Sequence, residues 1–413
     1  MQLDLFTPPK IDAVQFTEEL FAAYYECRKN KRNTSNALRF EVHLEANLFK
    51  LRDEILAGTY QPGRSIAFIV DKPVKREVFA ADFRDRVVHH FVIGKLNPLF
   101  ETLFIENSYA CRKNKGTLFG INQVYGFIKS ESNGYRTDAY ILKLDVQGFF
   151  MHIDKVKLWE RLESFIQTRY HAADKALLVE LSRKIIENDP TQNCTRKGSI
   201  HNWDDLPKDK SLFFSPPNCG LPIGNLSSQV FANFYLHPLD EFVTANLGFR
   251  SYGRYVDDFV VVNSDNDKLK TAITIIRSFL EVELSLRLHP RKIYFQHYSK
   301  GVKFLGFILK PGRKYIANRT KGNFYESIEK LNQHLVKSSE PYKTTRTLFL
   351  SSINSYLGII KHCQGKKLGI KMIQKRLHPS WWAFGFFNIT KWKFIFYKKR
   401  KKPVVLTCGG SNS

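Results

Sequence analysis

The chain has 413 residues, enough to bury more than one hydrophobic core, so we expect two or three subdomains. Its formal net charge is +25, from 64 Lys and Arg residues against 39 Asp and Glu residues. An excess of this size is typical of proteins that bind phosphate backbones, although charge spread evenly over a surface also serves solubility. The composition therefore favours nucleic acid as the partner.

The cysteines and the apolar segments argue against several other classes. The six cysteines form no CxxC pair and no Cys and His cluster at zinc-ligand spacing, so no zinc site is expected. Residues 1–16 carry acids and prolines where a signal peptide needs a basic start and an apolar run. The most apolar stretch, residues 381–389, is too short to cross a membrane. The sequence thus predicts a cytoplasmic protein that is neither exported nor inserted into a membrane.

The N-terminal part is expected to be mainly helical, with one strand pair. Apolar residues recur with the helical period over residues 16–58. A turn at 58–63 precedes two β-prone segments, 65–70 and 76–80, which we expect to pair as a hairpin. Further helices are expected over residues 82–104.

The middle of the chain alternates strands and helices. Residues 140–145 have the apolar content of a buried strand, and a helix is expected to begin near Asp154. Residues 189–220 are rich in Pro, Asn, Asp, Lys and Gly and predict a long irregular insertion. This insertion either touches bound nucleic acid or a protein partner, or only covers the neighbouring sheet. A helix over 226–236 and a hairpin over 254–262 follow, and after Gly306 the pattern becomes helical again.

Three aspartates stand where metal ions would need them. Asp145 ends a predicted strand, while Asp257 and Asp258 interrupt a β-prone run and lie at a predicted hairpin tip. Adjacent buried acids repel each other unless a cation compensates them, and Mg²⁺ prefers carboxylate oxygens on rigid backbone. Nucleotidyl transfer uses two such ions about 3.5–4 Å apart. The pattern predicts a two-metal site, with an exposed turn of two solvated aspartates as the alternative.

The order of motifs around these acids resembles that of bacterial reverse transcriptases. Residues 255–258, Tyr-Val-Asp-Asp, resemble the active-site hairpin of that family, and residues 144–150 resemble its first palm motif. The resemblance implies two Mg²⁺ ions, with Mn²⁺ as the alternative. The implied metal contacts are Asp145, Val146, Asp257 and Asp258.

The resemblance also implies a nucleotide pocket. Phe150 is expected to pack against the sugar and exclude a 2′-hydroxyl, although it could equally be a plain core aromatic. Residues 221–229 resemble the second palm motif, in which Gly224 lets the backbone approach the templating pair and Gln229 lies on the helix that supports the template. Ile223 replaces the glutamine of most reverse transcriptases. This exchange resembles the enzymes of diversity-generating retroelements and predicts error-prone copying opposite adenine.

The resemblance also implies basic side chains that contact the phosphates of the incoming nucleotide. Lys72 and Arg76 lie on the predicted hairpin where the family binds the incoming triphosphate, although either could be a solvated surface charge. Residues 288–292 resemble the fourth palm motif, which makes Lys292 the candidate general acid. The triplet 304–306, Phe-Leu-Gly, resembles the primer-grip turn.

The fold implied by the resemblance is an α/β (α+β) right-hand polymerase. We expect N-terminal helices and fingers over 1–135, an antiparallel-sheet palm over 136–312 with an insertion at about 166–220, a helical thumb over 313–390 and a basic C-terminal tail over 391–413.

The implied activity is RNA-directed DNA polymerisation, which makes cDNA from dNTPs on a template RNA. The favoured setting is a diversity-generating retroelement with an accessory protein, and no membrane partner is expected. A phage-defence reverse transcriptase that works with a structured non-coding RNA is the alternative within the enzyme class. A catalytically idle RNA-binding scaffold is the alternative outside that class.

Overall fold

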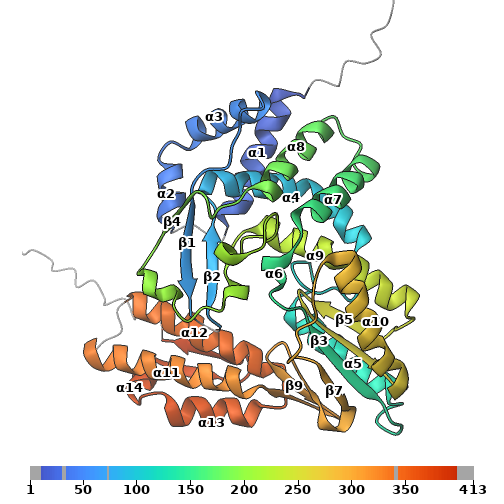
Figure 1. Ribbon diagram of the computed structural model, residues 1–413. Helices are drawn as coiled ribbons and strands as arrows, with labels where there is room; N and C mark the ends of the chain where they lie inside the picture. The colour runs from blue at the N-terminus through green and yellow to red at the C-terminus, as the bar shows by residue number, and fades with distance from the viewer. Residues whose placement is uncertain (1–10, 30–33, 72–73, 339–342, 398–413) are drawn as a thin grey trace, which may run out of the picture. The chain divides into compact units, whose positions relative to one another are not determined.

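The computed structural model describes residues 11–29, 34–71, 74–338 and 343–397. The chain divides into two compact units, Met1–Tyr298 and Ser299–Ser413 (Figure 1). Their boundary falls inside the region predicted as palm. Lys72 and the basic run 398–402 lie outside the described residues.

The first unit begins with a layer of helices. Asp12 caps the first helix by accepting a hydrogen bond from the Val14 N–H at 2.8 Å. Phe16 and Leu20 lie one turn apart on its buried face, where the Phe16 ring meets the Phe91 ring edge to face at 5.2 Å. The helices of this layer are α1 (Ala13–Arg28), α2 (Ser35–Glu41), α3 (Leu44–Leu56) and α4 (Phe83–Leu103).

A small sheet follows the helical layer. β1 (Ser65–Val70) and β2 (Arg76–Ala80) pair antiparallel, so the predicted hairpin is confirmed. β4 (Cys194–Arg196), from the predicted insertion, pairs parallel with β1, which gives the order β2-β1-β4. The rest of this segment forms three short 3-10 helices: η1 (Ile200–Trp203), η2 (Lys208–Lys210) and η3 (Leu212–Phe214). The insertion is therefore more ordered than its composition predicts.

The centre of the first unit is a four-stranded antiparallel sheet with the order β5-β6-β3-β7. Its strands are β3 (Tyr140–Asp145), β5 (Tyr252–Tyr255), β6 (Asp258–Asn263) and β7 (Tyr294–His297). Residues 259–262 are all 0% exposed, so both faces of the sheet are covered. Figure 1 shows α5 and α10 beside the sheet, and α9 packs on α10. The predicted mixed fold with an antiparallel-sheet palm is confirmed.

The other elements of this unit connect the layers. Asp154 accepts hydrogen bonds from the N–H groups of Val156 and Lys157, so it caps the helix predicted to begin there. The connecting elements are α5 (Thr117–Glu131), α6 (Phe149–His152), α7 (Lys155–Arg169), α8 (Lys175–Glu187), α9 (Leu226–Glu241), the π-helix η4 (Phe242–Asn246), α10 (Asn266–Leu284) and η5 (Tyr298–Lys300), which ends just past the boundary.

The second unit begins with a three-stranded meander of β8 (Val302–Phe304), β9 (Phe307–Lys310) and β10 (Arg313–Ile316). The predicted return to helix after Gly306 is therefore wrong for the next ten residues, because they complete this sheet. Four helices follow: α11 (Asn318–Ser338), α12 (Lys343–Lys361), α13 (Lys366–Arg376) and α14 (Ser380–Phe384).

A hairpin pairs β11 (Gly385–Asn388), at the end of the segment predicted as thumb, with β12 (Lys393–Phe396), in the first residues of the predicted basic tail. Phe394 is 1% exposed and packs on the Phe349 ring at 4.9 Å, so this part belongs to the core of the second unit. Among the described residues, no helix is long and apolar enough to cross a membrane.

Candidate active site

The strand register brings the three predicted aspartates together. Asp145 is the residue opposite Asp258 in the pairing of β3 with β6. The hairpin between β5 and β6 turns through Val256 and Asp257, and Val256 has a left-handed φ of 57°, which β-branched residues rarely adopt. The Val146 N–H donates to the Asp257 carbonyl at 3.2 Å. The end of β3 and the hairpin tip thus form one surface.

Two lysines pair with this acidic cluster. Lys292 Nζ lies 2.7 Å from Asp145 Oδ1, and Lys143 Nζ lies 2.8 Å from Asp258 Oδ1. A turn holds Lys292 in place, because the His289 N–H donates to the Asp145 carbonyl and the Lys292 N–H donates to the His289 carbonyl. The sequence did not lead us to Lys143. The available signal was its position two residues before Asp145, which puts both side chains on one face of β3.

Burial and mutual repulsion govern the protonation of the carboxylates. Burial raises the pKa of Asp257 to about 6, and the charge of Asp145 acts in the same direction. Burial also raises the pKa of Asp258 to about 6, against the opposing effect of Lys143. Ionising the cluster therefore costs free energy that a cation would offset.

The donors at this site are of the type that a hard divalent ion prefers. Three carboxylates converge, and the Val146 backbone carbonyl is the one group of that residue that could join them, since its side chain is apolar and its N–H is engaged. Within the described residues, no group of three or more His, Cys, Asp or Glu side chains is placed so that it could already hold a metal ion. Asp145 and Asp258 instead face the two lysines.

The residues predicted for the nucleotide pocket lie close together. The Leu221 N–H donates to the Phe150 carbonyl, and the Phe79 N–H donates to the Ile223 carbonyl, each at 2.8 Å. Gly224 has a φ of +126°, and a Cβ there would lie 2.7 Å from Val78 Cγ1. The same Cβ would lie 3.0 Å from the backbone oxygen of Phe79. Only glycine therefore fits where these two backbone segments approach each other.

Two other predicted residues, Arg76 and Gln229, are not joined to these groups in the described part of the chain, and a third lies outside it. Arg76 begins β2 as an exposed side chain, and no hydrogen bond or ion pair of the described residues links it to the carboxylates. Gln229 is exposed on α9, where its Oε1 accepts from Cys111 Sγ at 3.1 Å. Lys72 lies outside the described residues. The structure therefore brings together Asp145, Asp257, Asp258 and Lys292, and separately Phe150, Ile223 and Gly224.

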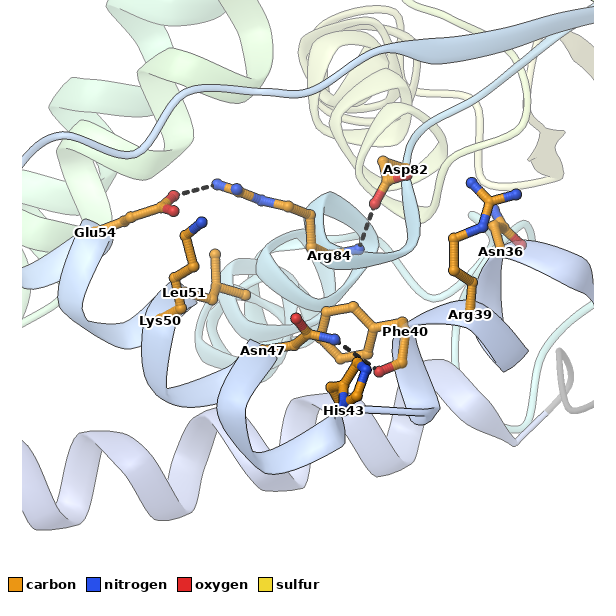
Figure 2. Close-up of a pocket in the computed structure, with 10 residues that line it drawn as sticks. All are labelled: Asn36, Arg39, Phe40, His43, Asn47, Lys50, Leu51, Glu54, Asp82 and Arg84. Atoms are coloured by element: carbon orange, nitrogen blue, oxygen red, sulfur yellow. Dashed lines mark hydrogen bonds and ion pairs between the residues drawn. The ribbon is translucent and has the colours of Figure 1, made fainter.

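A hollow lies among α2, α3 and the start of α4 (Figure 2). Its volume is about 380 Å³. Arg84 spans it and donates to Glu54 at 2.5 Å, whereas Arg39 and Lys50 form no ion pair with any described residue. We call it the cation-lined cavity; its lining residues are Asn36, Arg39, Phe40, His43, Asn47, Lys50, Leu51, Glu54, Asp82 and Arg84.

An antiparallel sheet with carboxylates at one strand end and at the adjacent hairpin tip is the palm of a right-hand nucleic-acid polymerase. A family model described as "Reverse transcriptase (RNA-dependent DNA polymerase)" matches residues 75–309, which is more than half of the chain. The chain belongs to this family.

Individual relatives are distant. The chain is 23% identical to Protein YkfC of Escherichia coli over 66% of its own length and 73% of that protein. It is 24% identical to the group II intron-encoded protein LtrA of Lactococcus lactis subsp. cremoris, over 54% of this chain but 33% of that protein. Telomerase from Candida albicans, solved with a fragment of telomeric RNA, superposes with a TM-score of 0.45 at 12% identity over 78% of this chain and 57% of that one. The chain thus spans only part of several proteins that it matches, and a TM-score of 0.45 adds nothing to the assignment.

Proposed function

We propose that the protein is an RNA-directed DNA polymerase that extends a 3′ end by templated addition of deoxynucleotides. The observation that carries this proposal is the convergence of Asp145, Asp257 and Asp258 at one end of the central strands β3 and β6 in a chain of this family. The region of β1 and β2 would act as fingers, the sheet as palm and α11 to α13 as thumb.

Each group of the site has a proposed task. Asp145, Asp257 and Asp258, with the Val146 carbonyl, would hold two Mg²⁺ or Mn²⁺ ions. When bound, these ions lower the pKa of the attacking hydroxyl and offset charge on the transferring phosphoryl group. Lys292 stands at the cluster with an ammonium proton to give to the leaving pyrophosphate.

The remaining assignments concern the bound nucleotide. Phe150 would pack against its sugar, and Gly224 would let the backbone approach the new base pair. Gln229 would help to support the template through α9. Arg76, together with Lys72, would contact the triphosphate of the incoming dNTP.

Replacing one carboxylate tests the site directly. With Mg²⁺, primed RNA and dNTPs, we expect the parent protein to make cDNA and Asp257→Ala to reduce the yield to background, because the metal ions lose a ligand. Asp267→Ala is the matched control, since the side chain of this exposed aspartate on α10 pairs with Lys270 and with no other described residue. Equal yields from parent and Asp257→Ala would refute the site. Tight RNA binding by a parent protein that makes no cDNA would favour the idle scaffold.

We propose further that copying is error-prone and serves a diversity-generating retroelement, which implies a dedicated template RNA and an accessory protein. The support is Ile223, a half-buried apolar side chain where most of the family carries glutamine. Without an amide beside the nascent pair, mispairs are rejected less strongly. We expect Ile223→Gln to lower misincorporation opposite template adenine by about tenfold. Sequencing of cDNA from both proteins measures this, and an unchanged error spectrum would remove the argument.

The partner RNA is proposed to contact the cation-lined cavity. Arg39 and Lys50 present charges that no described acidic group neutralises, in a protein whose net charge is +25. Phosphate groups of an RNA backbone supply the complementary charge.

A further inference from the structure

The insertion between α8 and α9 is anchored to the small sheet by a buried carboxylate. Glu77 of β2 is 1% exposed. Its Oε1 accepts from Trp203 Nε1 at 2.7 Å and from Ser211 Oγ at 2.9 Å, and its Oε2 accepts from the Leu212 N–H at 2.6 Å. Breaking these bonds would leave a buried carboxylate unsatisfied, which is costly. They therefore fix residues 203–212 against β2.

The same insertion also approaches the loop that follows Asp145. Gly148, three residues after this aspartate, has a φ of 54°. A Cβ on Gly148 would lie 2.7 Å from the backbone oxygen of Asp209 in η2. The insertion is thus in close contact with the segment that carries a proposed metal ligand.

The insertion also contributes to a small apolar cluster, which is distinct from the main core although Phe150 packs against both. It is formed by Ala67, Phe79, Met151 and Leu212, with Phe150, Cys194, Trp203, Phe213 and Ile223 packed around it. The Phe213 ring lies 5.4 Å from the Phe79 ring, and the Arg196 guanidinium covers Phe213 at 4.4 Å. Phe150 and Ile223, the residues proposed to meet the sugar and the new base pair, therefore pack against a cluster that the insertion completes.

We infer that the insertion forms the rear wall of the nucleotide pocket, and that Leu212 and Phe213 are positioning residues for nucleotide selection. Because closely packed side chains do not move independently, the volume behind Phe150 and Ile223 decides how far each can recede. Smaller side chains at positions 212 and 213 would give Phe150 room to move back, so that the pocket admits a 2′-hydroxyl. This inference rests on the proposed polymerase function.

The test compares nucleotide binding without turnover. The full chain is bound to a primed RNA whose primer ends in a dideoxynucleotide, in Mg²⁺, and dATP and ATP are titrated against a templating U by calorimetry. We expect Leu212→Ala and the milder Phe213→Leu each to lower the ratio of the ATP to the dATP dissociation constant by about tenfold. Leu178→Ala, a fully buried leucine in α8 within the main core, is the control for loss of stability and should keep the parent ratio.

The outcomes separate this inference from the polymerase proposal. Parent-like ratios in both wall variants, in folded protein, would overturn the rear wall. A change of the same size in Leu178→Ala would also overturn it, because selection would then follow general stability. A parent protein that prefers dATP but makes no cDNA would contradict the polymerase proposal. The ratios of the dissociation constants in the wall variants would still show whether the insertion is the rear wall. If the parent binds neither nucleotide, both fall.

Discussion

Arg254 links the core of the palm to the tip that carries Asp257. Its side chain and that of Asp240 are 0% exposed, and Nε and Nη2 donate to the two Asp240 oxygens at 2.7 and 2.6 Å. Nη1 donates to the carbonyl of Val256, the left-handed residue of the turn, at 2.9 Å. A planar guanidinium can donate to the Asp240 carboxylate and to the Val256 carbonyl at the same time, whereas the ammonium group of a lysine cannot. Arg254 thus holds the hairpin tip in position.

Two substitutions of Arg254 separate its charge from its geometry. Arg254→Lys keeps the charge but loses the fixed fork, so we expect a folded protein with kcat lower by about 100-fold, because the hairpin tip is misplaced. Arg254→Met leaves the Asp240 carboxylate buried without a counter-charge, which costs about 3–5 kcal/mol, and we expect little folded protein. Steady-state cDNA synthesis at saturating dNTP gives kcat.

Tyr252→Phe is the matched control for this network. The Tyr252 hydroxyl donates to Asp240 Oδ1 at 2.6 Å but has no bond to the turn. Its loss should lower the free energy of unfolding by about 1 kcal/mol and leave kcat unchanged. If Arg254→Lys has the kcat of the parent, or if Tyr252→Phe loses as much, Arg254 has no positioning role.

At the scale of elements, one buried carboxyl joins a turn to the start of α4. Asp85 is 2% exposed and accepts from the Tyr60 hydroxyl at 3.0 Å and the Gly63 N–H at 2.8 Å. Burial raises the pKa of Asp85 to about 6, although these hydrogen bonds act in the opposite direction. A carboxyl whose pKa is higher in the folded state contributes its full stability only below its unfolded pKa. That contribution is lost as the pH rises through about 6.

The Asp85→Asn variant isolates this contribution. From Asp85 alone, the parent should lose about 1 kcal/mol of its free energy of unfolding between pH 5 and pH 7.5, and the variant should not. Urea denaturation gives the free energy of unfolding of parent and variant at both pH values. Asp257 and Asp258 titrate in both proteins, so their contribution cancels in the difference between the two. A difference that is the same at both pH values would show that Asp85 does not titrate in this range.

The elements that the sequence predicted well are those with local signals. The apolar run of β3 ends in an acid, and the hairpin at 254–262 has β-prone flanks, so both appear without knowledge of their partners. β4 gave no such signal, because three residues of a polar insertion become a strand only beside β1, far away in the sequence. β9 and β10 were missed for a different reason: strands of four residues carry too little periodicity to be recognised.

The site residues likewise divide into those with a local sequence signal and those that only tertiary packing identifies. The sequence pointed to Asp257 and Asp258 because two adjacent acids in an apolar strand pair are costly without a cation, and to Asp145 because it ends an apolar strand. Arg254 and Glu77 read like surface charges in the sequence, and only tertiary packing shows that both are buried and fully engaged.

At the scale of the whole molecule, a net charge of +25 predicts RNA binding that weakens with salt, because each phosphate contact releases counterions. Such a charge does not say where the RNA lies. The cation-lined cavity is a specific candidate, since Arg39 and Lys50 stand on neighbouring helices with no ion-pair partner among the described residues (Figure 2).

The double variant Arg39→Gln/Lys50→Gln should therefore bind RNA more weakly and with less dependence on salt. If each side chain neutralises one phosphate, the slope of log affinity against log salt should fall in magnitude by about 1.4 for two single-strand contacts. The control Lys129→Gln/Arg169→Gln removes the same charge from exposed positions outside the cavity. Fluorescence anisotropy with a labelled RNA at 50 to 200 mM salt, a range in which such contacts dominate, gives both slopes. Equal slopes for the two double variants would mean that the cavity contributes only its share of the overall charge.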